Sequence, residues 1–276
     1  MALNSVNTNV GAMVALQNLQ KTNSQLATTQ NRINTGLAIG SAKDNGAIWA
    51  IAQTQRAESS SLNAVKSSLQ RGQSTIDVAL SAGESVSDLL VQMQTLALSA
   101  SDASLGTTAR ASLNEDFKNL RDQIKTVVTN AGFDGTNLLG TGTAGYKALA
   151  NAKGTSTIDV AQQNMALSGS IVTVASAGVI NTVTTAKAMI TTVETSIKNV
   201  STALSKLGTA SKAFENHLTF VGKLQDSLDA GVGNLVDADL AKESARLQSL
   251  QTKQQLGVQA LSIANSSTSI LLGLFR

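Results

Sequence analysis

The stretch LQNLQKTNSQLATTQNRINTGL, residues 16–37, indicates how the chain folds. Its large apolar residues recur at spacings of three, four and seven, a pattern typical of a helix that packs in a coiled coil. They are Leu16, Leu19, Leu26, Ile33 and Leu37. Asn23 and Gln30 fall in the same stripe, where polar residues can fix the register at a cost in stability. The stretch therefore predicts a long amphipathic helix, and Gly36 and Gly40 bracket the expected break after it.

Both ends of the chain are apolar at helical spacing and carry no charge. Residues 1–20 contain no Asp, Glu, Lys or Arg, and neither do residues 254–275. A helix with an apolar stripe and no charged face lacks the usual means of staying soluble alone. We therefore expect the two ends to bury each other, and then to bury their joint stripe against other copies of the chain. This predicts an assembly subunit.

The composition favours long helices and excludes several kinds of site. The chain has 276 residues and no proline, the residue that most strongly breaks a helix. It has no cysteine, which excludes a disulfide and a thiol nucleophile, and its single histidine, His217, excludes a multi-histidine metal site. The net charge of +3 is spread along the chain without aromatic clusters, which disfavours a nucleic-acid partner. We expect no membrane insertion and no cleavable signal peptide.

The first half of the chain continues with two further helical patterns. Ser41 and Asp44 form an S-x-x-D pattern that can cap a new helix, and the apolar period then continues to about Ser101. A second amphipathic helix follows a turn near Gly106, with a charged face opposite its apolar one. Its apolar residues are Leu113, Phe117, Leu120, Ile124 and Val127.

The middle of the chain differs, and the last part mirrors the first. Residues 130–183 are rich in glycine and in short β-branched pieces such as 155–160 and 170–174, which predicts one or two small β-hairpins with long loops. The helical period returns at about Thr184. Gly231 and Gly233 are expected to interrupt it, and Asp237 and Asp239 to cap a final helix.

The predicted fold is mainly α: a long antiparallel helical coiled coil or bundle built from both chain ends, with a small β-hairpin region in the middle. We expect an inner-core helix at 1–40, shell helices and the β-rich segment at 41–183, a shell helix at 184–234, and an inner-core helix at 235–276 that pairs with 1–40. The residues predicted to form the polymerisation core are Leu16, Leu19, Leu26, Ile33, Leu247, Leu250, Leu261, Ala264, Leu271 and Leu274.

Several ordered motifs resemble those of bacterial flagellin, the filament subunit of the flagellum. Residues 31–37 with 41–45, read NRINTGL and SAKDN, are similar to the family's N-terminal motif. The segments FDGTNLL at 133–139 and DADLAKE at 237–243 resemble its turn and the opening of its last helix. The residues that carry the match are Arg32, Gly36, Asp44, Phe133, Gly135, Asp237, Asp239, Glu243 and Arg276.

The resemblance implies a subunit that polymerises into the hollow filament used for swimming, with its terminal helices in an inner layer and the middle of the chain outward. It implies copies of itself or paralogous flagellins as partners, together with the flagellar export apparatus, an export chaperone, the filament cap and hook-junction proteins. It implies secretion by the flagellum's own type III route. It implies no enzyme activity and no cofactor.

Two departures from the family pattern are visible. The middle is short, so the large outer domains of longer flagellins are not expected. The segment QTLALS at 94–99 aligns with the stretch that an innate immune receptor recognises in many members, but it lacks their charged pair. We expect weak receptor activation.

Three other functions compete with that of a filament subunit. A hook–filament junction protein shares similar ends and remains the alternative. A chemoreceptor-type signalling hairpin would need charged flanks along its heptads and a membrane anchor. A hydrolase would need a nucleophile next to a base, and the sequence offers no such pair.

Overall fold

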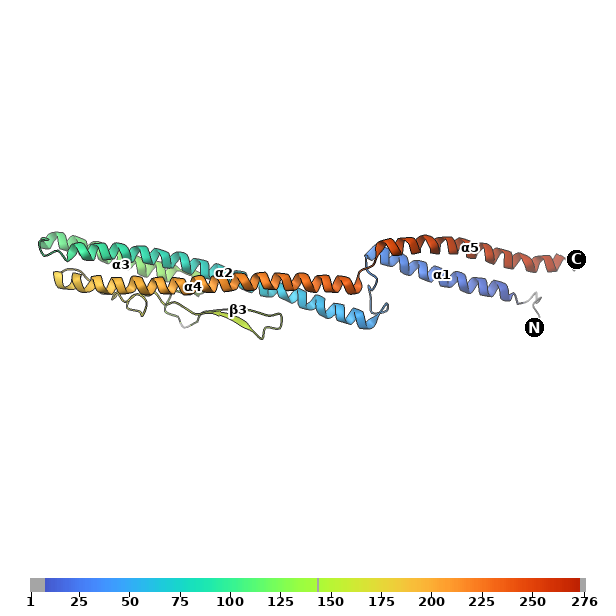
Figure 1. Cartoon of the computed structure of the whole chain (residues 1–276), viewed down its shortest axis with the longest axis horizontal. Helices are drawn as coiled ribbons and strands as arrows, with labels where there is room; N and C mark the ends of the chain where they lie inside the picture. The colour runs from blue at the N-terminus through green and yellow to red at the C-terminus, as the bar shows by residue number, and fades with distance from the viewer. Residues whose placement is uncertain (1–7, 143, 274–276) are drawn as a thin grey trace. The chain divides into compact units, whose positions relative to one another are not determined.

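The structure, a computed structural model, describes residues 8–142 and 144–273, with side chains in the last helix described as far as Ser266. Its helices are α1 (Val10–Thr35), α2 (Gly46–Ala100), α3 (Thr107–Asn130), α4 (Val183–Val236) and α5 (Leu240–Gly273) (Figure 1). Its strands are β1 (Gly132–Phe133), β2 (Thr136–Asn137), β3 (Tyr146–Leu149) and β4 (Thr157–Val160). The chain is therefore mainly helical, as predicted.

The chain divides into two compact units. The terminal unit holds the residues up to 57 and those from 227 onward, and the central unit holds residues 58–226. The long helices α2 and α4 contribute residues to both units.

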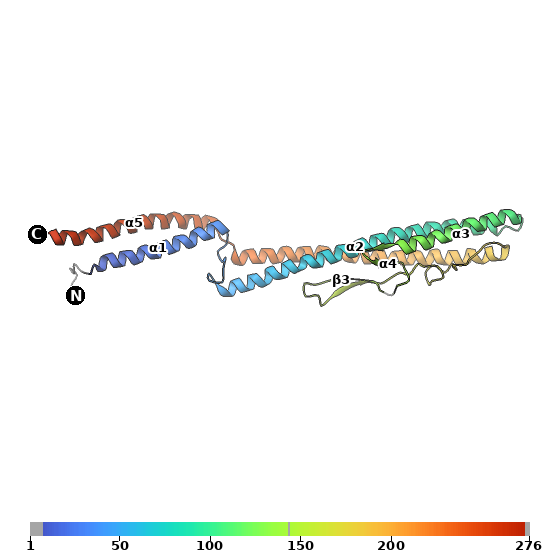
Figure 2. The same ribbon diagram turned by 180° about the vertical axis from the view of Figure 1, so that it is seen from behind.

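The terminal unit is built on an antiparallel pair of helices. α1 and α5 lie side by side in both ribbon views (Figures 1 and 2). Asn9, which caps α1, donates a hydrogen bond from its Nδ2 to the backbone oxygen of Ala264, 2.6 Å away. Where the helices approach closely, a Cβ added to Gly257 would lie 3.2 Å from Cδ1 of Leu19. The expected pairing of the two chain ends is confirmed.

The two breaks in the helical pattern are joined to each other. α1 ends at Gly36, whose φ of 71° is a left-handed conformation that favours glycine. Leu37 and Asp237 form an antiparallel bridge, and Ala38 N donates to Val236 O at 2.7 Å. Beneath the bridge, a small core of Ala52, Val232 and Val236 packs against Leu37, Ile39 and Ile48. The loop after α1 and the turn before α5 are therefore held together within the terminal unit.

Two details of the breaks differ from the predictions. Asp44 does not cap α2. Its Oδ2 accepts hydrogen bonds from Gly40 N and Ser41 N and so closes the loop before the helix, while Asn45 Oδ1 accepts from Ile48 N at 3.2 Å and takes the capping role.

Gly231 and Gly233 do not interrupt the second long helix, which continues through both to Val236. A helical glycine loses only about 1 kcal/mol relative to alanine, and this cost is offset by packing. The break falls at Asp237 and Ala238, where the backbone turns to the bridge. Asp239 alone supplies the predicted cap, since its Oδ1 accepts from Ala241 N and Lys242 N.

The central unit buries one continuous apolar core among α2, α3 and α4. Its fully buried residues recur at the helical spacing read from the sequence. They include Leu62, Leu69, Ile76, Leu90 and Met93 of α2, Phe117 and Ile124 of α3, and Val193, Val200, Leu207 and Phe214 of α4. The predicted apolar faces of these helices are thus their packed faces.

Two small hairpins follow α3, as expected for the glycine-rich middle. β1 and β2 pair across a turn in which Asp134 and Gly135 both have positive φ, 48° and 76°. Such a turn matches the twist of a two-residue hairpin loop and suits a D-G pair. β3 and β4 pair antiparallel with Tyr146 opposite Val160.

The second hairpin packs on the helices of the central unit. The Tyr146 hydroxyl donates to Ser68 O at 2.9 Å, and Leu149 N donates to Ser68 Oγ at 3.1 Å. A side chain at Gly72 would overlap the rings of Phe214 and Tyr146, so glycine is required for this close approach.

The segment 170–174 is not a strand, contrary to the sequence pattern. Its β-branched residues Val172 and Val174 are fully buried, so they serve as packing groups of an irregular loop. Side chains form hydrogen bonds with the backbone of that loop. Thr173 N donates to Ser196 Oγ at 3.0 Å, where a strand neighbour would otherwise be needed.

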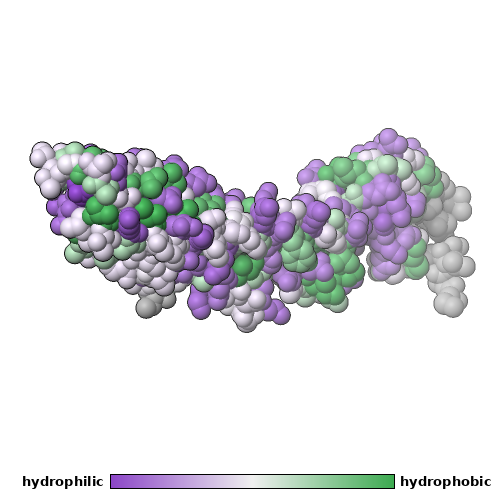
Figure 3. Space-filling model, turned by 60° about the vertical axis from the view of Figure 1, so that its left-hand side comes forward, coloured by the Kyte–Doolittle hydropathy of each residue, from purple (hydrophilic) through white to green (hydrophobic). Residues whose placement is uncertain are grey.

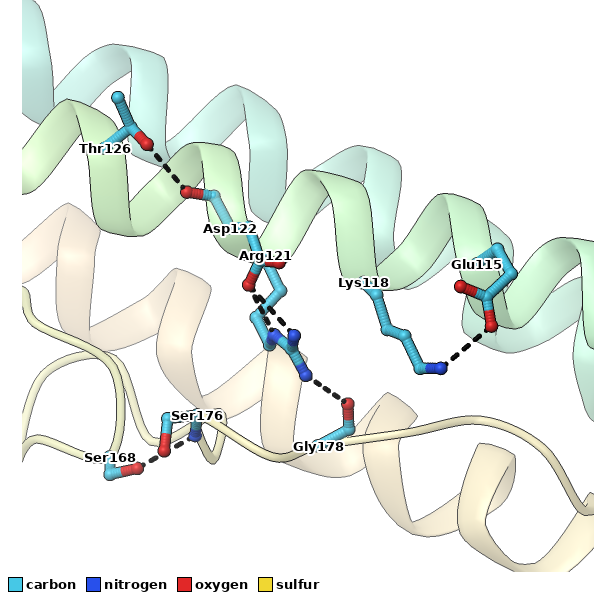
Figure 4. A network of polar contacts seen from close by, with 8 residues as sticks. All are labelled: Glu115, Lys118, Arg121, Asp122, Thr126, Ser168, Ser176 and Gly178. Carbon is cyan, nitrogen blue, oxygen red and sulfur yellow. Dashed lines mark hydrogen bonds and ion pairs between the residues drawn. The ribbon is translucent and has the colours of Figure 1, made fainter.

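A polar surface runs along α3 and the loop before α4 (Figure 4). Lys118 pairs with Glu115 at 2.8 Å, and Arg121 pairs with the neighbouring Asp122 at 2.9 Å. Arg121 also donates from Nη1 to the backbone oxygen of Gly178, which ties the loop to the helix. These charges are explained by solvation and loop anchoring.

In the swimming filament that the resemblance to flagellin implies, an insertion at Gly154 is expected to leave assembly intact. Gly154 lies in the exposed loop between β3 and β4, has φ 67°, and has open space around it. Lengthening such a loop costs about 0.6 kcal/mol per doubling. A short polar tag inserted there should change the melting temperature of the subunit by only a few degrees, and motility should persist. An antibody against the tag should decorate intact filaments. Loss of motility, or an inaccessible tag, would contradict the outward placement of this loop.

Candidate assembly surface

The predicted polymerisation core lies mostly in the contact between α1 and α5. Leu250 is 3% exposed. The half-buried members are Leu19, Leu26, Ile33, Leu247, Leu261 and Ala264. The structure thus brings these residues together within one subunit before any second copy is added.

Leu16 stands apart from this contact, and for three further predicted residues the structure describes no side chain. Leu16 is 45% exposed and is left on the surface of α1. Leu271 lies within α5, but its side chain is outside the described part. Leu274 and Arg276 lie outside the described residues altogether.

The sequence stripe missed a second set of apolar residues on the same pair of helices. These residues are exposed in the single subunit and fall between the heptad positions, so a search for heptads passes over them. They are Val10, Met13 and Val14 of α1, and Leu256, Val258 and Ile263 of α5. Leu240 lies on the predicted heptad series with Leu247 and Leu261, yet it too is exposed. The available signal was that residues 1–20 and 254–275 lack charge. A helix at the surface of a soluble protein normally has charged residues on its outer face, so their absence indicates that the outer face is also covered.

Figure 3 shows hydrophobic residues on the surface of the α1–α5 pair, next to a band of hydrophilic ones. Ile263 is the most exposed of the large apolar residues in this set, at 69%. Leu16, Leu240 and the six missed residues together form what we call the outer apolar set. It comprises Val10, Met13, Val14, Leu16, Leu240, Leu256, Val258 and Ile263.

An ion pair fixes α1 against the first turns of α5. Arg32 Nη1 lies 3.1 Å from Glu243 Oε1, and the side chains are 29% and 10% exposed. Arg32 Nε and Glu243 Oε2 are buried without a hydrogen-bond partner, so the pair is joined through one contact only. The motif residues Arg32 and Glu243, 211 positions apart, therefore meet directly.

The remaining motif residues shape the backbone on either side of this pair. Gly36 ends α1, Asp237 forms the bridge, and Asp239 caps α5. Hydrogen bonds from the side chain and backbone of Ser41 hold the pKa of Asp44 below its usual range. Because that pKa is lowered, the loop contact is present at neutral pH and is lost as the pH falls through it. Phe133 and Gly135 belong to the first hairpin of the central unit.

In the filament that the resemblance to flagellin implies, removing one partner of the ion pair should weaken the assembly, and removing both should do less harm. Arg32→Met leaves a largely buried carboxylate unpaired, at a cost of about 1–3 kcal/mol. The double variant Arg32→Met with Glu243→Leu removes both charges. We expect filaments of the single variant to dissociate at a lower temperature than wild type, and filaments of the double variant at an intermediate or equal temperature. Strictly additive losses would show that the two residues are not coupled.

Few features of the described chain suit a small ligand. No group of three His, Asp or Glu residues gathers among the described residues. A cavity of about 470 Å³ beside β1 and β2 has no titratable side chain in its lining. None of the described helices has both the length and the apolar character needed to cross a bilayer.

Two family models match most of the chain. Residues 6–143 match the bacterial flagellin N-terminal helical region, and residues 190–275 match the bacterial flagellin C-terminal helical region. The chain belongs to the bacterial flagellin family. Flagellins are structural proteins of the extracellular flagellar filament, and this flagellin is a subunit of that filament.

Flagellins of known organisms match the sequence of this chain over its full length. Flagellin FljK of Caulobacter vibrioides is 59% identical over 276 residues, covering 100% of both chains. A flagellin of Brucella melitensis is 38% identical, covering 99% of both. These full-length matches confirm a short flagellin without large outer domains.

A solved structure from Vibrio parahaemolyticus, described as a flagellar hook-associated protein, shares the fold of this flagellin. It has a TM-score of 0.57 and 16% identity, and the match covers 70% of this chain and 100% of that one. At this identity the likeness concerns the fold alone. Because the relatives that match over the full length are flagellins, the junction-protein alternative is not favoured.

Proposed function

We propose that α1 and α5 form the inner layer of the filament, and that the outer apolar set is buried there against other copies. The observation that carries this proposal is the exposure of eight large apolar residues on two helices whose outer parts carry no charge. A soluble monomer rarely exposes such a set unless it binds something. A second copy of the same chain offers the same exposed apolar residues on helices whose outer parts, within residues 1–20 and 254–275, carry no charge.

The division into layers follows from this assignment. Residues 1–40 and 235–276 would lie inside, residues 41–183 and 184–234 would form the surrounding shell, and the hairpin loops would face outward. The exposed loop at Gly154 supports the outward position.

The filament can contain this chain alone or together with related flagellins. Caulobacter vibrioides has several flagellins that are 58–59% identical to this chain over all its residues. Subunits that share the contact residues of α1 and α5 can substitute for one another in a helical lattice. We propose a homopolymer or a mixed filament.

Assembly outside the cell requires further partners. We propose that the subunit is secreted through the flagellar type III export apparatus with the help of an export chaperone, and is added beneath the filament cap above the hook-junction proteins. Membership of the flagellin family supports this route.

The inner-layer assignment can be tested at Ile263. The side chain is mostly exposed in the single subunit, so Ile263→Ser should leave the melting temperature of the monomer unchanged. If the residue is buried on assembly, the lost apolar contact costs about 1.5–3 kcal/mol, which raises the critical concentration for polymerisation about 10- to 100-fold. Ile263→Leu is the matched control and should polymerise normally. Equal critical concentrations for the serine variant and wild type would refute burial of this residue.

A further inference from the structure

Met13 differs from the other described methionines in its exposure. It is 56% exposed on α1, whereas Met93 and Met165 are fully buried in the central unit. Met189 of α4 is half-buried. In the free subunit, a reagent in solution therefore reaches the side chain of Met13 more readily than those of Met93, Met165 and Met189.

The position of Met13 on the helix places it away from α5. A Cβ added at Gly11 would lie 3.9 Å from Ala264 Cβ, so Gly11 faces α5. Two residues further along, the helix has turned by about 200°. Met13 is thus on the far side of α1, beside the exposed Val10 and Val14, which follow the i, i+3, i+4 spacing of one helical surface.

We propose that Met13 is an oxidation site that controls assembly, and that a peroxide is the oxidant. One oxygen of the peroxide is transferred to the sulfur: an S–O bond forms, the O–O bond breaks, and the peroxide leaves as an alcohol, or as water when hydrogen peroxide is used. The sulfur is oxidised to the sulfoxide and the peroxide is reduced. This inference rests on the proposed burial of the outer apolar set.

The sulfoxide changes the fit of this surface. It replaces a flexible apolar group with a polar, chiral one that needs a hydrogen-bond donor when it is buried. Val10 and Val14 offer only methyl groups beside it. Oxidised subunits are therefore excluded from the growing filament, while Met13 in assembled subunits is covered and protected.

The test compares free subunits with assembled filaments. Monomers and preformed filaments receive the same dose of hydrogen peroxide, and peptide mass spectrometry then measures the oxidised fraction of each methionine. We expect Met13 to be oxidised in the monomer well before Met93 and Met165, and to be protected at least fivefold in the filament. Seeded polymerisation of the treated monomer should require at least a tenfold higher concentration.

Met13→Leu is the matched variant, since it keeps an apolar side chain of similar size and removes the sulfur. It should polymerise like untreated wild type, and the same peroxide dose should not affect it. Treatment of oxidised wild-type monomer with the two methionine sulfoxide reductases, one for each sulfoxide epimer, and a dithiol as reductant should restore polymerisation.

Three results would overturn the proposal while untreated wild type polymerises: normal assembly of monomer that carries the Met13 sulfoxide, equal inhibition of Met13→Leu, or equal oxidation of Met13 in filaments. These results differ from the one expected if the outer apolar set is not buried on assembly. In that case Ile263→Ser polymerises like untreated wild type.

Discussion

A chain that ends at Val236 is expected to form no filaments and to keep a folded central unit. The truncation removes α5, and with it the partner that covers Leu19 and the other stripe residues of α1. The core of the central unit is supplied by α2, α3 and α4, none of which is shortened. The expected result is a secreted, soluble chain that retains cooperative unfolding.

Electron microscopy, sedimentation and circular dichroism of the truncated chain check this result. Sedimentation should leave it in the supernatant at concentrations where the full chain pellets. Hydrogen exchange should show protection in α3 and little in α1. Filaments of normal length from the truncated chain would refute the inner-layer assignment of α5.

Leu261→Asp is expected to give secreted monomer and no polymer. Leu261 lies on α5 between Gly257, which approaches Leu19, and Ala264, which approaches Gly11. An aspartate there places an unpaired carboxylate in an apolar contact, at a cost of several kcal/mol in each subunit. In a mixture with wild-type chains, each variant subunit still carries the defect. Mixing should therefore rescue assembly only partly.

Leu261→Met is the control, because it keeps the volume and the apolar character of the side chain. It should polymerise within about threefold of the wild-type concentration. Pelletable filaments of the aspartate variant at ordinary concentrations would mean that this part of α5 is not buried.

The helices were predictable because a periodic apolar stripe directly encodes a packed face. Most of the stripe of residues 16–37 lies in α1. Of the apolar positions predicted in residues 113–127, Phe117 and Ile124 are buried in α3, and Leu113, Leu120 and Val127 are half-buried. The boundaries were less predictable because several residues compete for one role. Ser41, Asp44 and Asn45 can all cap a helix, and the structure assigns that role to Asn45 because Asp44 closes the preceding loop.

The candidate surface was predicted in its location but only partly in its residues. The absence of charge in the two end segments pointed to α1 and α5. The heptad pattern, however, finds the contact between these two helices, whereas Met13 and Ile263 lie off that pattern. The meeting of Arg32 with Glu243 could not be read from spacing, because it depends on the register of two helices that are distant in the sequence.

The antiparallel pairing of the two chain ends also sets an order of folding. The contact from Asn9 to Ala264 closes a loop of 255 positions, which by chain entropy alone costs about 5 kcal/mol. Folding of the central unit lowers this entropy cost, because it brings the first part of α2 beside the last part of α4. There Gln225 Nε2 donates a hydrogen bond to the backbone oxygen of Ser59. A chain that emerges end-first from a narrow passage cannot complete the α1–α5 pair until its last helix is free. On the export route that we propose, the assembly surface therefore forms last, where the subunit leaves the channel.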